Sequence, residues 1–399
     1  MAIEVPGRSR REALQLAALV GGVAAAPGLS RATEAADPFA CGLAPADDLA
    51  LTGPLPEDPK AVETYNVWLH DADRGTGVNL HPYLQNGVMT AMATFFLPDG
   101  RILRAHDKPG TFTSPSDPHG ATIQYHCDRP FHGWSYQAKD LPVFVTTVEQ
   151  QKAGVAPVEV ATTKLSFEIK ARTRAPIWMQ GVLLPEAKQE IHGLPGKWMG
   201  NMLSNGPSPL ARRYDQALSG EGVISFEGKQ YPLSGHGLRG HVRGVRVMDG
   251  MEGHTWIGAV FESGMCVGIQ CYPRVDGGYH YSEAYIYKDG EVHPNRVIYV
   301  SRLNRNPHKD AFVAELACDA LGLTRITGED HQALWWAMAA WGGARAAGDP
   351  LDRRPGRYAY GADPTAPMLM KQALATFDCN GERGVGMQER SGSVETSET

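Results

Sequence analysis

The densest group of side chains able to do chemistry lies in one glycine-rich segment, Ser234–Arg246, which holds two histidines and three arginines among four glycines. Glycine permits irregular backbone and close approach of a ligand. Positions 239, 241 and 243 alternate, so in a strand their side chains share one face. If that face lines a barrel, His241 transfers a proton, Arg239 and Arg243 are its electrostatic partners, and His236 contacts substrate. The alternative is a surface loop whose arginines pair with solvent-exposed acids.

A second group combines aromatic residues with one acid. Alternate positions place Glu283 on one strand face with four tyrosines, Tyr279, Tyr281, Tyr285 and Tyr287. Such a face supplies aromatic walls, a carboxyl group and phenol donors to a pocket. We predict Glu283 and Tyr281 as a second acid–base pair, with Tyr279 and Tyr285 as substrate contacts. The alternative is an ordinary outward-facing strand, on which tyrosine is a favoured residue.

A third group lies early in the chain, where Trp68 and His70 share a face of a predicted strand and are candidate substrate contacts. Asp71 points the other way. A metal site needs three or four converging ligands, and neither HxH nor HExxH occurs among the 14 histidines. The 6 cysteines include no CxxC pair. We therefore expect no bound metal.

Three glycines, Gly235, Gly237 and Gly240, match the G-x-G-x-x-G spacing of dinucleotide-binding loops. That loop must open a helix, whereas Val242–Val247 has the pattern of a strand. The chain also has neither a phosphate-binding Walker loop nor a G-x-S-x-G elbow. We expect no cofactor.

The elements that must position these groups are predicted to be strands. With 399 residues, 42% of them hydrophobic, the chain can bury a large core, and its 45 glycines and 28 prolines imply many turns. Alternation such as Leu165, Phe167 and Ile169 with polar residues between them is typical of half-buried strands. Short strands at a spacing of roughly 8–12 residues favour a sandwich or barrel. We predict an all-β fold of two tandem barrels, in residues 61–218 and 219–390.

One stretch departs from this pattern. Lys309–Leu321 carries apolar residues at helical spacing before Gly322, a helix-ending residue type, and Thr327–Asp330 resembles a helix capping box. We predict a helical insertion at about residues 308–348. Beyond the last strands, the polar residues 391–399 are predicted to be a disordered tail.

The first residues have the pattern of an export signal. Arg10 and Arg11 precede an apolar run, Ala13–Pro27, and a small-residue cleavage site at Ala32. The paired arginines indicate the bacterial twin-arginine translocation machinery, although a basic amphipathic helix is the alternative. We predict a signal peptide over residues 1–32, a linker over 33–60, and a periplasmic or secreted protein without a stable membrane span.

The charge balance excludes one class of partner. The formal net charge is −6 and the isoelectric point is near 6.2. Nucleic-acid binding requires a basic excess that releases counterions. We therefore expect no nucleic-acid partner.

Four pieces of the chain together resemble a known family. The segment Leu233–Arg246 is similar to the motif G-x-G-x-R-D-H-x-W-G-x-R of the lipocalin-like AttH and carotenoid 1,2-hydratase (hydroxyneurosporene synthase) proteins, with Gly240 where that family commonly has Asp and Arg243 where it has Trp. The other three pieces follow in order around it, namely Asn66–Asp71 with Gly75–His81, Arg213–Gln216 with Gly220, Gly222 and Gly228, and Asn380–Glu389. The resemblance covers about residues 65 to 390. It implies tandem lipocalin-like (calycin) β-barrels.

Two functional hypotheses follow. The first is an exported, cofactor-independent hydratase, dehydratase or isomerase that acts on a hydrophobic isoprenoid-like substrate (terpenoid, carotenoid or steroid) by acid–base chemistry. The second is an exported protein that binds such a lipid without a reaction. A metal-dependent oxidase is a third possibility. Hydration of an alkene needs a strong, placed acid, and without the family's Asp this acid is His241 or comes from elsewhere, such as Asp249, Glu252 or Glu283.

Overall fold

The computed structural model describes residues 37–54, 61–154, 163–181, 212–244, 251–338 and 358–398. The chain divides into Met1–Ala36 and a compact unit, Asp37–Thr399, which contains all the described residues. The predicted signal peptide, residues 1–32, lies outside the described residues and stays a prediction. Among the described residues, no helix has the length and apolar character needed to cross a membrane.

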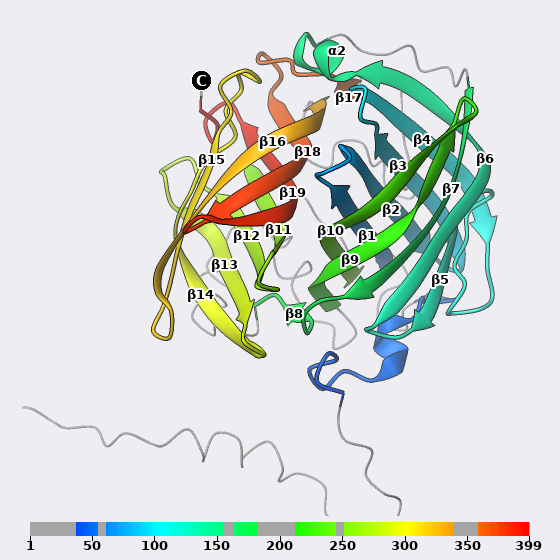
Figure 1. Ribbon diagram of the computed structural model, residues 1–399, viewed down its shortest axis with the longest axis horizontal. Helices are drawn as coiled ribbons and strands as arrows, with labels where there is room; N and C mark the ends of the chain where they lie inside the picture. The colour runs from blue at the N-terminus through cyan, green and yellow to red at the C-terminus, as the bar shows by residue number, and fades with distance from the viewer. Residues whose placement is uncertain are drawn as a thin grey trace, which may run out of the picture. The chain divides into compact units, whose positions relative to one another are not determined.

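Residues 62–244 contribute the first closed antiparallel barrel, of eight strands (Figure 1). Its strands follow the order β10-β1-β2-β3-β4-β6-β7-β9, and β9 pairs with β10 to close the sheet. The short strands β5 and β8 pair with β6 and β9. The strands are β1 Val62–Asp71, β2 Thr76–Gln85, β3 Val88–Phe96, β4 Arg101–Thr111, β5 Gln124–Arg129, β6 Gly133–Thr147, β7 Thr163–Thr173, β8 Trp178–Met179, β9 Arg212–Phe226 and β10 Lys229–Gly244.

Residues 253–393 contribute the second barrel, again of eight antiparallel strands. The order is β15-β14-β13-β12-β11-β19-β18-β16, closed by β15 with β16, and β17 pairs with β16. The strands are β11 Gly253–Phe261, β12 Cys266–Pro273, β13 Tyr279–Lys288, β14 Glu291–Val300, β15 Phe312–Cys318, β16 Gly322–Met338, β17 Tyr358–Tyr360, β18 Met368–Cys379 and β19 Glu382–Ser393. The predicted all-β fold of tandem barrels is confirmed.

The predicted helical insertion at 308–348 is wrong over its described part. Residues 312–318 and 322–338 are β15 and β16, and Gly322, with φ of +69°, begins β16 directly after the turn at 319–321. Leu334 and Trp336 pack on one face of β16 while Trp335 and Ala337 pack on the other. A strand buried on both faces is apolar at every position, so it also satisfies the helical spacing. Residues 339–348 lie outside the described residues.

Three predicted boundaries differ from the strand pairing. Because β9 and β10 both belong to the first sheet, that barrel continues to Gly244, past the predicted boundary at 218/219. The described part of the predicted linker, 37–54, contains the 3-10 helix η2 (Pro45–Asp48), whose Asp48 is buried. The predicted tail begins inside β19, and Thr396 is buried and hydrogen-bonded to the Glu252 carbonyl.

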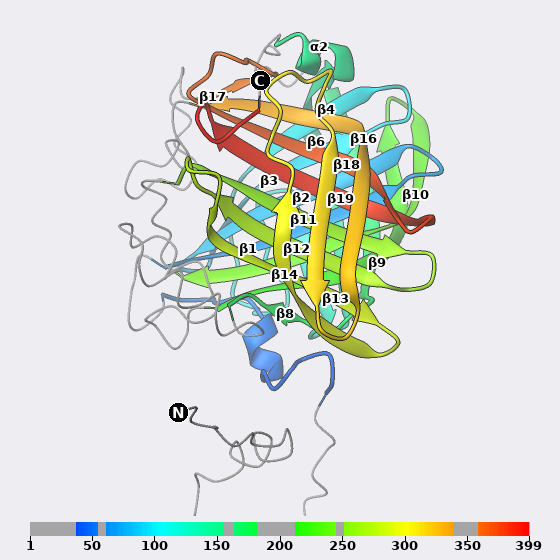
Figure 2. The same cartoon turned by 90° about the vertical axis from the view of Figure 1, so that its left-hand side faces the viewer.

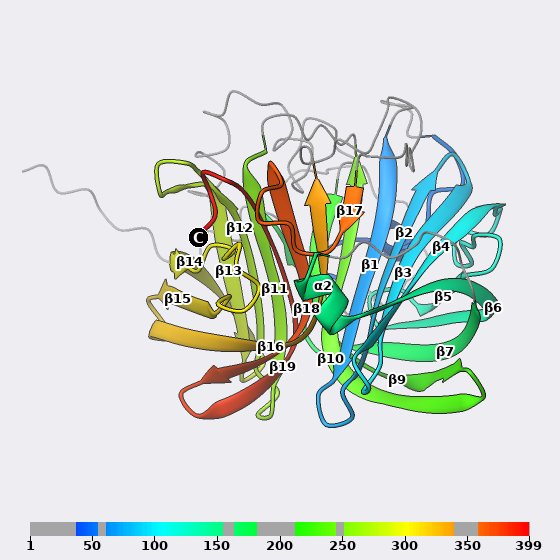
Figure 3. The same ribbon diagram turned by 90° about the horizontal axis from the view of Figure 1, so that it is seen from above.

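The two barrels pack side by side along a seam formed by β1 and β10 of the first and β11 and β19 of the second (Figures 2 and 3). The outward faces of these strands include an apolar cluster, unlike the polar wall of a solvated barrel. Trp68 and Leu238 of the first barrel pack with Trp256, Leu374 and Met387 of the second. The helix α2 (Val148–Lys152) adds a further link, because the Gln151 side chain accepts the Trp335 backbone N–H at 2.9 Å.

Candidate functional site

The glycine-rich segment forms most of β10, and its alternation divides its side chains between two environments. Arg239, His241 and Arg243 lie inside the first barrel, where all three are buried. Leu238 and Gly240 face the seam, because Leu238 packs in the inter-barrel cluster and Gly240 lies against Trp256. The structure therefore brings three predicted site residues together and separates them from the seam.

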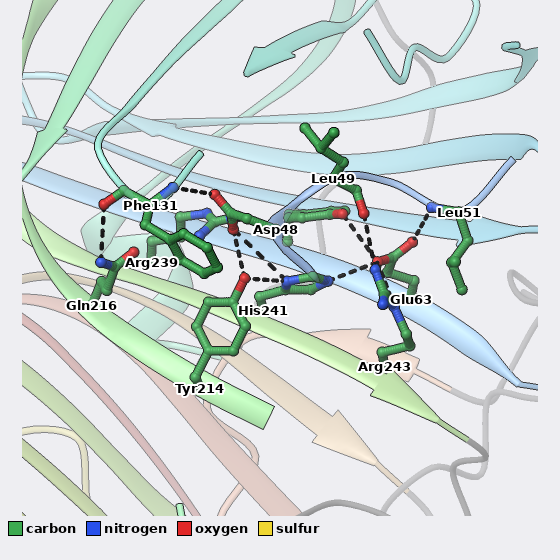
Figure 4. Close-up of polar contacts among 11 residues, drawn as sticks. Asp48, Leu49, Leu51, Glu63, Phe131, Tyr214, Gln216, Arg239, His241 and Arg243 are labelled. Carbon is green, nitrogen blue, oxygen red and sulfur yellow. Dashed lines mark hydrogen bonds and ion pairs between the residues drawn. The ribbon is translucent and has the colours of Figure 1, made fainter. Parts of the chain in front are cut away.

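Asp48 is the first acid of this interior network, and it enters from the segment predicted as a linker (Figure 4). Its Oδ1 accepts hydrogen bonds from Arg239 Nη2 and from the Tyr214 hydroxyl, each at 2.5 Å. Its Oδ2 accepts the Phe131 backbone N–H at 2.7 Å. Both carboxyl oxygens are thus bonded, in a site where Asp48 is 1% exposed.

Glu63, on β1, is the second acid. Its Oε1 accepts from His241 Nε2 at 2.7 Å, from Arg243 Nη2 at 2.7 Å and from the Tyr65 hydroxyl at 3.0 Å. Its Oε2 accepts the Leu51 backbone N–H at 2.8 Å. Burial alone raises the pKa of Glu63, but the Arg243 charge and these hydrogen bonds lower it to about 2. Glu63 is therefore ionised.

His241 lies between the two acids and stacks on Tyr65 with ring centroids 4.2 Å apart. Its Nδ1 is 2.6 Å from the Tyr214 hydroxyl. Burial and the charges of the nearby arginines lower the pKa of His241, and the Glu63 hydrogen bond opposes them. The pKa of His241 falls below its usual value. Both ring nitrogens are engaged by protein groups, so the network offers no unoccupied proton-transfer atom at His241.

The network is also balanced in charge, with one arginine for each acid. One nitrogen, Arg239 Nη1, has no hydrogen-bond partner among the described residues. The same guanidinium lies over the Trp134 ring, 4.0 Å from its centroid, where a cation is stabilised by the π face. These contacts describe a compensated interior that holds η2, β1, β9 and β10 together.

A different arrangement surrounds Asp215, which lies on the seam side of β9 and is 0% exposed. Gln180 Nε2 and Trp256 Nε1 both donate to Oδ2, at 2.6 and 2.8 Å. Oδ1 has no hydrogen-bond partner among the described residues. Burial raises the pKa of Asp215 to about 6, against the opposing effect of the Arg213 charge and the two donors.

Asp215 stands directly opposite Gly240 in the β9–β10 register. A Cβ at position 240 would lie 2.9 Å from Asp215 Oδ1 and 2.9 Å from the Trp256 ring, so a larger residue there must displace a packed neighbour. Asp215 thus places a carboxyl group beside position 240 from the neighbouring strand.

Glu283 and Tyr281, predicted as an acid–base pair, are joined by a hydrogen bond on the seam side of β13. Glu283 also accepts from Trp178 Nε1 at 3.1 Å and from the Gly181 backbone N–H at 2.6 Å. Gly181 has φ of +75°, a left-handed conformation that favours glycine. Glu283 therefore anchors the segment whose Gln180 bonds to Asp215.

Unbonded polar atoms concentrate in this cluster. Arg213 Nη2 donates to Gln270 Oε1 at 3.0 Å, and Gln270 is opposite Glu283 in the β12–β13 register. Among the described residues, Gln270 Nε2 and Gln180 Oε1 lack partners, as Asp215 Oδ1 does. Buried polar groups are normally bonded, so these bare acceptors and this bare donor are atoms to which a ligand or water can bond.

The other predicted contacts lie apart from this cluster or at its margin. Tyr285 packs on Trp178 with ring centroids 5.0 Å apart, while Trp68 belongs to the apolar seam. His70 and His236 are partners in the β1–β10 register and line a cavity of about 220 Å³ between the barrels. Burial lowers the pKa of His70 to about 4 and that of His236 below its usual value.

The predicted alignment of Tyr279 with Tyr281 and Glu283 is wrong. The register shifts between Tyr272 and Pro273, so the β-bulge separates Tyr279 from the residues that follow it. Tyr279 packs against the core inside the second barrel, and its hydroxyl accepts the Val300 N–H at 3.0 Å.

Sequence reasoning missed four residues of the two networks, Asp48, Glu63, Gln180 and Asp215. Asp215 lies within a piece that carries the family resemblance, and its alternation with Tyr214 signals opposite faces. Asp48 lies in a segment whose composition is typical of a linker, so nothing local marks it. Among the described residues, no three His, Cys, Asp or Glu side chains are grouped to hold a metal ion.

Comparison with known protein families identifies the family to which the chain belongs. The family described as "Domain of unknown function (DUF7064)" matches residues 45–345. The chain belongs to this family. The match covers the first barrel and β11 to β16 of the second, and it includes Asp48, Glu63, Asp215 and Glu283. None of the curated proteins matches the chain.

Solved structures with similar folds include a protein assigned as AttH from Nitrosomonas europaea, with a TM-score of 0.51 and 13% identity over 90% of this chain and 100% of that one. CghA is similar with a TM-score of 0.45 and 13% identity over 86% of this chain and 90% of that one. Kievitone hydratase from Nectria haematococca gives 0.45 and 7% identity over 88% of this chain and 94% of that one. The AttH structure confirms the predicted lipocalin-like two-barrel fold.

Proposed function

We propose that the protein is an exported, cofactor-independent enzyme that adds water to, removes water from, or isomerises a double bond of a hydrophobic isoprenoid-like molecule, with Asp215 as the proton donor. The export part rests on the paired arginines Arg10 and Arg11. The chemical part rests on the seam cluster, and one observation carries it: a buried acid whose two hydrogen-bond donors both bond to the same oxygen.

That arrangement favours a carboxylic acid able to give up a proton. The donors from Gln180 and Trp256 occupy Oδ2, so a proton on Asp215 resides on Oδ1. Burial, which raises the pKa of Asp215 to about 6, keeps that proton in place in mildly acidic solution. A general acid works best when its pKa lies near the working pH.

The surroundings suit an apolar substrate that develops positive charge. Trp256 and Trp178 direct their N–H groups to the two acids, so both indoles border the cluster. Indole faces stabilise a cation through their quadrupole. Glu283 with Tyr281 provides a second hydrogen-bonded acid–base pair in the same cluster.

The test uses isotopic labels, because it does not require the substrate to be known. The full chain is incubated with an ethyl acetate extract of the cells that produce it, in D2O, and products are analysed by mass spectrometry. We expect apolar products that gain deuterium with the wild-type protein and not with Asp215→Asn. The matched control is Asp107→Asn, a buried acid that accepts the Thr122 and Ile123 backbone N–H groups within the first barrel.

The alternative function, carriage of a lipid without reaction, gives a different result. Native mass spectrometry then shows a retained apolar molecule, while no product gains deuterium with either protein. Equal labelling by wild type and Asp215→Asn would also overturn the assignment of the proton donor.

A further inference from the structure

A second buried acid lies beside Trp256 on the neighbouring strand. Glu389 is the cross-strand partner of Trp256, so the two side chains share the seam face of the second barrel. Its Oε1 accepts from His254 Nε2 at 2.6 Å, and its Oε2 accepts from the Gln372 amide. Gln372 Oε1 in turn accepts the Trp336 indole N–H at 3.1 Å. Each Glu389 oxygen thereby accepts one hydrogen bond from the described residues and keeps a second lone pair that can take up a proton.

The hydrogen bonds also fix the orientation of the His254 ring. The His254 backbone N–H donates to Ser391 Oγ at 2.9 Å, and the same hydroxyl lies 2.8 Å from His254 Nδ1. The other ring nitrogen, Nε2, faces Glu389 and donates to it. This is the orientation that keeps Glu389 an acceptor.

The charges around Glu389 favour its ionised form. Burial raises the pKa of Glu389, but the hydrogen bond and charge of His254, the Gln372 hydrogen bond and the charge of His81 on β2 together lower it below its usual value. Asp215, which bonds to the same Trp256, has the opposite shift. Two acids whose pKa values are shifted in opposite directions by their environments suit the roles of acid and base.

We infer that Glu389, oriented by His254, is the base of the seam site, and that the reaction there is the addition of water to a carbon–carbon double bond or its reverse. This inference rests on the proposed function. In the forward direction, the Asp215 O–H bond breaks and a C–H bond forms, which leaves a cation at the neighbouring carbon. Water forms a C–O bond to that carbon and gives a proton to Glu389. Exchange with solvent returns the proton to Asp215, so one water is consumed and no oxidant or reductant is needed.

The experiment repeats the extract incubation in H2¹⁸O mixed with D2O, so that water addition and isomerisation differ. We expect wild-type products that carry both ¹⁸O and deuterium. Glu389→Gln keeps the hydrogen-bonding shape but cannot take up a proton, so its ¹⁸O product falls about a hundredfold or more. The matched control is Glu315→Gln, which alters an ion pair of the second barrel, with Arg325 at 2.9 Å. Circular dichroism and thermal unfolding check that each variant folds.

If Glu389→Gln does not fold, a variant of its partner His254 provides the test instead. His254→Asn retains a donor near Glu389 but changes its orientation, and we expect a smaller loss with an altered acid limb of the pH profile. Products with deuterium but no ¹⁸O, still dependent on Asp215, would overturn the inference and leave the proposed function standing. The same holds if Glu389→Gln matches the Glu315→Gln control. Absence of any labelled product with the wild type would overturn the proposed function itself.

Discussion

The interior of the first barrel and the seam between the barrels both bury acids, but the surroundings of these acids differ. Inside the barrel, Asp48 and Glu63 each bond to an arginine, and every oxygen of both carboxylates is bonded. In the seam, Asp215 bonds only to neutral donors and keeps one oxygen bare among the described residues. Similar burial therefore gives a charge-compensated network in one place and an acid with a raised pKa in the other.

The two environments also have opposite consequences for stability at different pH. The pKa of Glu63 is lowered to about 2, so its contribution to stability is present above the unfolded value of 4.5 and is lost as the pH falls. The pKa of Asp215 is raised to about 6, so its contribution is present below 3.8 and is lost as the pH rises through 6. Variants that remove either acid test this difference between the two regions.

The largest effect is expected from Glu63→Ala. This change leaves the Arg243 guanidinium buried without its acid partner, and such an unpaired buried charge costs about 3–5 kcal/mol. Urea denaturation at pH 7 measures the loss. The control is Glu227→Ala, which removes an exposed partner of Arg101 and costs less than about 1 kcal/mol. Equal losses in the two variants would remove the structural role assigned to the barrel network.

The next effect concerns Asp215→Asn and has the opposite sign. A pKa rise from 3.8 to about 6 corresponds to about 3 kcal/mol that the wild type loses between pH 4 and pH 8. The amide has no charge to bury, so we expect this part of the pH dependence to disappear and the variant to be the more stable protein at pH 8. Urea denaturation across that range measures the difference. A variant with an unchanged slope would show that Asp215 is ionised throughout.

The architecture could be predicted from the sequence because alternation is local. Leu165, Phe167 and Ile169 signal a half-buried strand from their own spacing, and all three lie in the core of the first barrel. The error at β16 has an equally local cause, since residues such as Leu334 and Trp335 are buried on opposite faces of one strand. The spacing of apolar residues therefore does not distinguish a strand from a helix where the strand is covered on both sides.

The sites were less predictable because their members come from distant parts of the chain. Alternation places Arg239, His241 and Arg243 together, but it cannot show that the segment around Asp48 closes on them from 191 residues away. In the same way, Gly240 stands where the resembling motif has an Asp, and only the β9–β10 register shows that Asp215 lies beside it. Pairing between strands, not the strand itself, assembles the chemistry.

A smaller effect is expected where Gly240 separates the two regions. Gly240→Ala places a methyl group 2.9 Å from both Asp215 Oδ1 and Trp256, and overpacking of this kind costs about 1–3 kcal/mol. It also displaces the bare oxygen, so deuterium labelling should fall together with stability. Gly133→Ala is the matched control, because its nearest neighbour is 3.7 Å away. Equal behaviour of the two variants would show that Asp215 tolerates displacement.

The smallest effect on stability distinguishes the two regions most cleanly, because it removes one hydroxyl from each. Tyr65 donates to Glu63 inside the barrel, and Tyr281 donates to Glu283 in the seam. Each Tyr→Phe change should cost about 1 kcal/mol in urea denaturation, the usual net value of one hydrogen bond. Their effects on labelling should differ. With Tyr65→Phe, labelling stays within about twofold of the wild type. With Tyr281→Phe, labelling falls about tenfold, because the loss of about 1 kcal/mol of transition-state stabilisation lowers a rate by about that factor. If Tyr65→Phe instead reduces labelling and Tyr281→Phe does not, the barrel interior is the reactive region and the seam is the structural one.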